Sequence, residues 1–342
     1  MSAVQPPAAD VPTLEQIQDN AARLAPYIVR TPVQPWSVER VPSALVPDFE
    51  VQLKLELWQH GGTFKTRGAL SNMLGLTAEE RLRGVTAMSA GNHAVAVAYA
   101  ANRLGVPAKL VMQQTANPAR RAAALSFGAE ILIAADGPSG FALAEDIAAR
   151  EGRRFIHPFD GKGVALGSGS LGLEWLAQCP DIEAIVVPVG GGGLAGGLSH
   201  AVRLAKPACE IYGVEPAGAN VMQRSFQAGS AQRFERFSTI ADSLAPPMTL
   251  ELPYRLCRDN LSDLVTVDDD EICRALALLF ASMQLAVEPA AATALAGVLG
   301  PLRKRLRGRK VAAIVCGTII DPPTYLALLE RGTAALASAV SK

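Results

Sequence analysis

Short apolar runs alternate with longer amphipathic segments along most of this chain. The runs are rich in β-branched residues, as in strands buried on both faces; they are residues 51–57, 85–88, 108–112, 130–134, 184–189, 210–215, 264–267 and 311–317. Between them lie segments with the period of a helix, residues 93–105, 117–128, 141–150 and 269–285. This alternation predicts an α/β protein whose mostly parallel sheets are flanked by helices.

Two helix starts have a recognisable capping pattern. Thr13 with Gln16, and Asp268 with Glu271, have the spacing of a capping box, in which each side chain bonds the backbone N–H of the other residue. Residues 84–157 contain a compact strand–helix series. We therefore predict a small inserted α/β domain at 84–157 within a large domain made of residues 1–83 and 158–342.

Composition narrows the possible partners and compartment. The chain has 342 residues, 49% of them hydrophobic, and its 32 basic and 32 acidic residues balance. This balance gives no reason to expect nucleic acid or an anionic membrane as a partner. The five cysteines form no CxxC pair, and no apolar run has the length of a membrane span. We expect a cytoplasmic protein without disulfides or a zinc site.

A run of glycines follows the strand predicted at 184–189. Gly190, Gly191, Gly192 and Gly193 lead into the apparent start of a helix at Leu194. Glycine lets the backbone approach a ligand closely, and a helix N-terminus offers unpaired N–H groups, so this turn can hold a phosphate. The run lacks the Gly-Lys-Ser/Thr of a P-loop and the spacing of a dinucleotide-binding turn. The alternative is a plain tight turn.

The segment "SAGNHA", residues 89–94, also joins a strand to a helix. Its small residues expose backbone N–H groups that suit a carboxylate. Asn92 is a compact donor and acceptor that can reach a ligand oxygen. The alternative is that Ser89 and Asn92 only cap the helix.

A lysine stands in an unusual setting in "GGTFKTRGAL", residues 61–70. Lys65 follows two glycines and Phe64, where a solvated surface lysine has no reason to lie. An apolar setting and a neighbouring positive charge lower the pKa of a lysine and make it nucleophilic. Phe64 and Arg67 are the residues expected to supply these two effects.

In this order, the lysine, the SAGNH loop and the glycine run resemble the pyridoxal-phosphate (PLP) enzymes of fold type II, the tryptophan synthase β-like family. The resemblance extends from "RTPVQPW" to "CGTIID" and is strongest to the threonine/serine dehydratases and serine racemases. It implies two α/β domains, PLP as the cofactor, a small amino-acid substrate and a homodimer.

The resemblance also implies a role for each matching residue. Lys65 would be joined covalently to PLP, and Cys316 would face the pyridine nitrogen. The remaining PLP contacts would come from Phe64, Asn92, Gly190, Gly191, Gly192, Gly193, Leu194 and Glu288. The substrate carboxylate would meet the loop formed by Ser89, Ala90, Gly91, Asn92 and His93.

The implied activity is an ammonia-lyase (dehydratase) reaction on a 3-hydroxy-L-amino acid such as threonine or serine. Lys65 would remove the α-proton, the β-hydroxyl would leave, and a 2-oxo acid and ammonia would result. A Cys316 thiol is a weak donor that leaves the pyridine nitrogen mostly neutral, which favours prompt loss of the β-leaving group.

Departures from the family pattern keep alternatives open. Ala90 replaces the second serine of the serine racemases and cannot transfer a proton, so two-base racemisation is expected to be weak. Glu215 matches one ligand of their divalent cation, but Val221 replaces the other, so we expect no metal site. A larger or acidic substrate (3-hydroxyaspartate, phenylserine or a hydroxyectoine-derived compound), a racemase, a β-replacement synthase and an anion-binding protein without chemistry remain alternatives.

Overall fold

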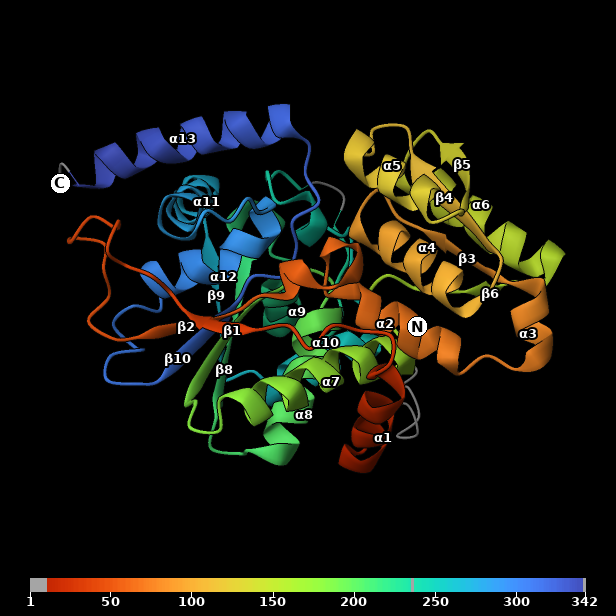
Figure 1. Cartoon of the computed structure of the whole chain (residues 1–342), viewed down its shortest axis with the longest axis horizontal. Coiled ribbons are helices and arrows are strands. Elements are labelled where there is room, and N and C mark those ends of the chain that lie inside the picture. The colour runs from red at the N-terminus through yellow and green to blue at the C-terminus, as the bar shows by residue number, and fades with distance from the viewer. Residues whose placement is uncertain (1–10, 235–236, 341–342) are drawn as a thin grey trace.

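The protein is built on two sheets, as the computed structural model of residues 11–234 and 237–340 shows (Figure 1). One sheet has six strands in the order β1-β2-β10-β7-β8-β9, and the other has four in the order β5-β4-β3-β6. Only β1 and β2 pair antiparallel; every other neighbouring pair is parallel. The predicted α/β class with mostly parallel sheets flanked by helices is confirmed.

Each predicted strand run contains a strand. The six-stranded sheet consists of β1 (Val33–Pro35), β2 (Val51–Lys54), β7 (Ala184–Pro188), β8 (Glu210–Pro216), β9 (Asp263–Val267) and β10 (Val311–Ile314). The four-stranded sheet consists of β3 (Val85–Met88), β4 (Ala108–Gln113), β5 (Glu130–Ala134) and β6 (Arg154–Phe155). Strands β1 and β6 were not predicted, because strands of three and two residues carry no readable period.

The helices cover both sheets. In chain order they are α1 (Leu14–Leu24), α2 (Lys65–Leu74), α3 (Ala78–Arg83), α4 (Asn92–Leu104), α5 (Pro118–Ser126), α6 (Gly137–Glu151), α7 (Lys162–Gln178), α8 (Gly193–Ala205), α9 (Val221–Ala228), α10 (Glu251–Asn260), α11 (Asp269–Met283), α12 (Pro289–Leu299) and α13 (Pro322–Val340). Both predicted capping boxes are present, at the starts of α1 and α11. Figure 1 shows α3 to α6 grouped around the four-stranded sheet and α13 along the six-stranded part.

Helix α2 joins the two halves of the molecule. Its residues Leu70 and Met73 belong to the apolar core of the four-stranded sheet, together with Leu110 of β4. The same helix packs against α7, which covers the six-stranded sheet. Because the core of the small sheet includes residues from outside 84–157, the predicted boundaries of the inserted domain stay a prediction.

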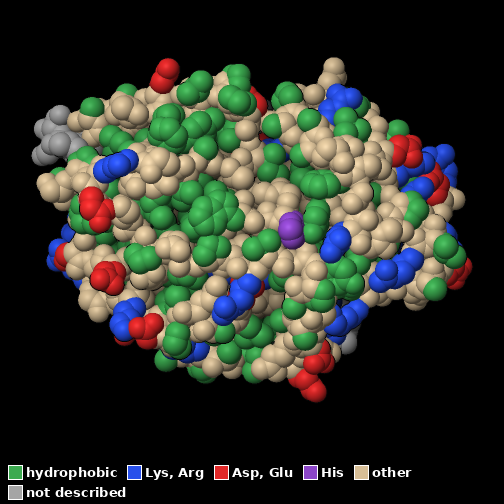
Figure 2. Space-filling model, viewed as in Figure 1, with side chains coloured by type: hydrophobic (Ala, Val, Ile, Leu, Met, Phe, Trp, Pro, Cys, Tyr) green, Lys and Arg blue, Asp and Glu red, His purple; other side chains and the backbone are tan. Residues whose placement is uncertain are grey.

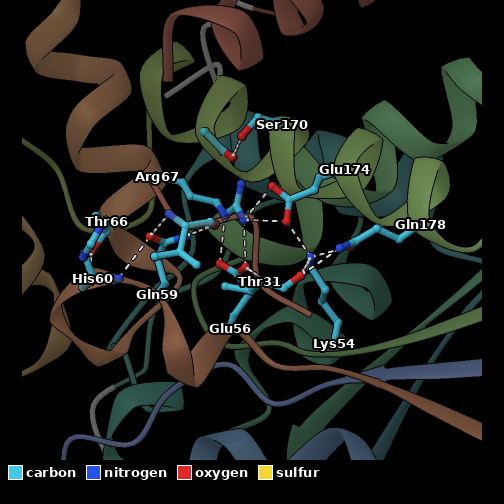
Figure 3. A network of polar contacts seen from close by, with 12 residues as sticks. Thr31, Lys54, Glu56, Gln59, His60, Thr66, Arg67, Ser170, Glu174 and Gln178 are labelled. Carbon is cyan, nitrogen blue, oxygen red and sulfur yellow. Dashed lines mark hydrogen bonds and ion pairs between the residues drawn. The ribbon is translucent and has the colours of Figure 1, made fainter. Parts of the chain in front are cut away.

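A buried network of charges fixes the start of α2 (Figure 3). Arg67 donates two hydrogen bonds of 2.8 Å to the carboxylate of Glu56 and also pairs with Glu174 of α7 at 3.0 Å. Lys54 of β2 binds the same Glu174 at 2.5 Å and the Thr31 carbonyl oxygen at 2.7 Å. The network therefore links β2, α2 and α7 through Arg67, two residues after Lys65, the first residue of α2.

The surface agrees with the balanced charge of the chain. On the face drawn in Figure 2, basic and acidic side chains are interspersed over the molecule. Within residues 11–234 and 237–340, no helix is both long enough and apolar enough to span a bilayer.

Candidate active site

Lys65 lies where α2 meets the end of strand β10. Thr63 forms a β-bridge with Gly317, and the Phe64 N–H donates to the Cys316 carbonyl oxygen at 3.1 Å. The fold thus brings "GGTFK" and "CGTII", some 250 residues apart in the sequence, side by side. Since ligands of parallel sheets bind beyond the carboxyl ends of the strands, this is the expected place for a site.

The amine of Lys65 has no carboxylate partner among the described residues. Its Nζ donates to the Pro158 carbonyl oxygen at 2.9 Å, and a small cavity beside it is also lined by Phe64, His93 and Leu194. Burial lowers the pKa of Lys65 to about 8, against the opposing effects of Cys316 and Glu288. An amine with this pKa has a far larger neutral fraction at physiological pH than an ordinary lysine, and the neutral form is the one that acts as a nucleophile or base.

The predicted contribution of Arg67 to this low pKa is wrong. Its guanidinium is engaged by Glu56 and Glu174, which offset its positive charge. Burial of the amine is instead the principal cause of the lowered pKa of Lys65. The local sequence "KTR" does not indicate that Arg67 pairs with Glu56 and Glu174, which lie in two other elements.

This pKa predicts how attachment of the aldehyde depends on pH. Only the neutral amine attacks a carbonyl, so the rate at which apoprotein reacts with PLP should rise with pH and level off above about 8. Stopped-flow absorbance between pH 6 and 10 measures it, with free lysine as the reference, whose rate should keep rising to a higher pH. A midpoint at the ordinary lysine pKa would contradict the assignment.

The glycine turn is closely packed. Gly192 has a φ of +93°, which favours glycine, and a Cβ at Gly191 would lie 2.5 Å from the Phe159 ring. A Cβ at Gly193 would come within 2.8 Å of the Phe159 backbone. Helix α8 begins at Gly193, so its first-turn N–H groups have no partner within the helix. The turn has the predicted form, and its phosphate-binding role stays a prediction.

The SAGNH loop does not serve as a side-chain cap. Gly91, not Ser89 or Asn92, precedes α4 in the N-cap position, without a side-chain bond, so the capping alternative is wrong. The Asn92 Nδ2 donates to Glu288 Oε1 at 2.6 Å, and the buried Asn92 Oδ1 has no partner within the described structure. Ser89 Oγ accepts from the Gly91 N–H at 3.0 Å, which shapes the loop. Ala90 lies between them in the same loop.

Two histidines beside Lys65 are held neutral. His93 Nε2 is 2.8 Å from the Ile156 carbonyl oxygen, and burial together with Lys65 lowers its pKa to about 3. Burial and the charge of Lys65 likewise lower the pKa of His157 to about 4. His157 has no role in the sequence prediction, yet its ring packs edge-on against Phe159 with centroids 4.6 Å apart.

Cys316 and Glu288 lie together near Lys65. Both are buried, and a Cβ at the intervening Gly317 would fall 2.4 Å from Glu288 Oε1. Burial raises the pKa of the Cys316 thiol well above its usual range, so the group stays protonated. A neutral thiol is a weak hydrogen-bond donor, the property on which its predicted role depends.

Glu215 is engaged by the protein backbone. Its two carboxylate oxygens accept from the N–H groups of Met222 and Gln223, each at 2.8 Å, at the start of α9. Burial raises its pKa to about 8. No cluster of three or more His, Cys, Asp or Glu residues in the described part of the chain has metal-binding geometry. The predicted lack of a metal site stays a prediction.

Known proteins similar to this chain point to one family. The model of the family "Pyridoxal-phosphate dependent enzyme" matches residues 24–317. The phenylserine dehydratase of Ralstonia pickettii is 47% identical over 322 residues, 94% of this chain and 98% of that protein. The L-threo-3-hydroxyaspartate ammonia-lyase of Saccharomyces cerevisiae is 35% identical, covering 94% and 97%. The structure of maize serine racemase has a TM-score of 0.87 at 31% identity, covering 95% and 98%.

The residues present fit PLP. A buried amine without an acidic partner suits an aldehyde, and a glycine turn at a helix N-terminus suits a phosphate. The unpartnered Asn92 Oδ1 marks a polar position that the protein alone leaves unsatisfied.

Proposed function

The chain belongs to the family of pyridoxal-phosphate dependent enzymes, and from that premise we propose that it is an ammonia-lyase acting on a 3-hydroxy-L-amino acid. The substrate loses its α-proton and β-hydroxyl, and hydrolysis of the dehydrated product releases a 2-oxo acid and ammonia. The observation that carries this proposal is the buried amine of Lys65, with its lowered pKa, beside the SAGNH loop and the glycine turn.

Bound PLP supplies an electron sink that makes the α-proton of an attached amino acid acidic. Lys65 would hold the aldehyde of PLP, and its amine, with a pKa lowered to about 8, would serve as the general base that takes the α-proton. The SAGNH loop would present N–H groups to the substrate carboxylate at the start of α4, and the glycine turn would hold the phosphate. The protonated Cys316 thiol would be a weak donor for the pyridine nitrogen.

Proton transfer from one face favours elimination over racemisation. A racemase needs a second acid or base on the side of the substrate opposite to Lys65. Ala90 occupies the predicted position, and a methyl group exchanges no proton. Chiral analysis of the amino acid recovered from incubations with L-serine tests this, and a substantial yield of D-serine would contradict it.

The substrate we favour carries an aromatic side chain. Phe141, Phe155, His157 and Phe159 form a half-buried aromatic cluster, with ring centroids 4.6–6.3 Å apart. Pro158, whose carbonyl oxygen accepts from Lys65 Nζ, lies between His157 and Phe159 in the sequence. Such a cluster gives an aryl ring edge-to-face partners. A second carboxylate, as in 3-hydroxyaspartate, would need a cation, but the neighbouring histidines are neutral and Arg120 beside the SAGNH loop is already paired with Asp242 and Glu288.

A substrate panel tests the reaction and the side chain together. We expect 2-oxo acid and ammonia from phenylserine, with a higher kcat/KM than from threonine, serine or 3-hydroxyaspartate. Removing the Phe141 ring in Phe141→Ala should lower kcat/KM for phenylserine about tenfold, and for threonine less. Phe127→Ala, which truncates a half-buried ring packed on Tyr99, is the matched control. Equal losses of kcat/KM for phenylserine and threonine would refute the proposed aromatic subsite.

Two further expectations complete the proposal. The resemblance implies a homodimer, which light scattering on the purified protein measures. The second expectation is the inserted α/β domain with boundaries at 84 and 157. Limited proteolysis tests it, because cleavage should concentrate at these boundaries.

A further inference from the structure

Arg120 is a buried arginine that crosses from one half of the molecule to the other. It lies on α5, beside the four-stranded sheet, and only 3% of it is exposed. Its partners all come from the other half: Asp242 at 2.5 Å, the Ile319 carbonyl oxygen at 3.1 Å and Glu288 Oε2 at 3.0 Å. No motif in the sequence marks this residue, which lies in an ordinary helical segment.

The most consequential of these contacts is the one to Glu288. This carboxylate is 1% exposed, and its second oxygen accepts the Asn92 amide at 2.6 Å. Arg120, Glu288 and Asn92 thus form a continuous chain from α5 to the SAGNH loop. A buried carboxylate without a cationic partner would take up a proton. Burial does raise the pKa of Glu288, and Arg120 opposes that effect most strongly.

The charge of Glu288 decides which way the Asn92 amide faces. An ionised carboxylate accepts hydrogen bonds only, so it draws Nδ2 of Asn92 toward itself. The second N–H of that nitrogen and Oδ1 then remain for a ligand. A protonated carboxyl can donate as well as accept, which removes the preference and lets the amide turn over.

Arg120 also lies against the substrate loop. A Cβ at Gly91 would be 3.2 Å from Arg120 Nη1, so the guanidinium packs on the backbone of this loop. A loss of Arg120 would therefore act at two neighbouring points of one site, the amide of Asn92 and the backbone at Gly91.

We propose that Arg120 is a positioning residue that keeps Glu288 ionised and thereby fixes the orientation of the Asn92 amide toward the cofactor. The inference rests on the proposed function, since it assigns the partner of Asn92 as PLP. Arg120 touches neither the reacting atoms nor Lys65; it acts through Glu288. Asp242 and the Ile319 carbonyl hold the guanidinium in place.

A double-mutant cycle tests this arrangement. We expect Arg120→Met to lower kcat/KM about 10- to 100-fold, to weaken PLP binding to the apoprotein and to shift the visible absorption band of the holoenzyme. Arg120→Lys, which keeps the charge, should restore the band and recover most of the activity. Glu288→Gln should reproduce most of the loss, because an amide both donates and accepts and therefore no longer fixes the orientation of the Asn92 amide.

The double variant distinguishes an effect of Arg120 that acts through Glu288 from a nonspecific loss of structure. If Arg120 acts through Glu288, Arg120→Met with Glu288→Gln should be no more than about threefold worse than Glu288→Gln alone. Losses that multiply, or an Arg120→Met holoenzyme with an unchanged absorption band, overturn the proposal. Arg150→Met, which breaks an exposed pair with Asp146 on α6, is the control and should leave all three readouts unchanged.

Measurements on the wild-type protein distinguish a failure of the proposed function from a failure of the proposed role of Arg120. Wild-type protein that takes up no PLP would refute the proposed function itself. Wild type that binds PLP and turns over substrate, with an Arg120→Met variant indistinguishable from it, would refute only the role of Arg120.

Discussion

Lys65→Ala is expected to abolish covalent attachment of PLP and to reduce turnover at least a thousandfold. The substitution removes both the amine that is joined to the aldehyde and the base that takes the α-proton, and a positioned base alone contributes about 10²- to 10⁴-fold. Borohydride reduction followed by peptide mapping measures the attachment. Release of 2-oxo acid measures the turnover.

An exposed lysine provides the matched control. Lys304 lies on the surface, and Lys304→Ala should retain the label and the full activity. A label on a residue other than Lys65 in wild type would refute the assignment, as would a Lys65→Ala protein that keeps more than a tenth of its turnover.

Arg67→Met should be the most destabilising substitution near the site. It removes the cation that neutralises Glu56, which is fully buried, and that also pairs with Glu174 (Figure 3). Breaking a buried ion pair from one side costs about 3–5 kcal/mol, because a buried charge is left without its partner. Urea unfolding followed by circular dichroism measures this loss.

The comparison for Arg67 is an arginine in an exposed pair. Arg150→Met removes an ion pair with Asp146 in which both side chains are more than half exposed, and it should cost less than about 1 kcal/mol. Equal effects of the two substitutions would mean that the network of Figure 3 contributes little to stability. The expected order also separates the structural role of Arg67 from the chemical role of Lys65.

Much of the fold follows from local patterns. The β-branched runs became strands because such residues suit a sheet buried on both faces, and the capping pairs at Thr13 and Asp268 involve residues only three apart. The glycine turn after β7 was likewise readable, since consecutive glycines between a strand and a helix have few other uses. The resemblance then implied the roles of Lys65 and Asn92.

What the sequence by itself determined is therefore the succession of elements, the turns between them and the candidate lysine, all of which depend on neighbouring residues. Only the tertiary structure decided which charges meet. In the folded protein Arg67 forms ion pairs with Glu56 and Glu174 and does not lower the pKa of Lys65. Arg120 forms a hydrogen bond with Glu288, 168 residues away. It also gathered Phe141, Phe155, His157 and Phe159 into one aromatic cluster. Side chains so far apart along the chain meet only after the sheets have formed and the helices have packed, and one sequence carries no local signal of such pairings.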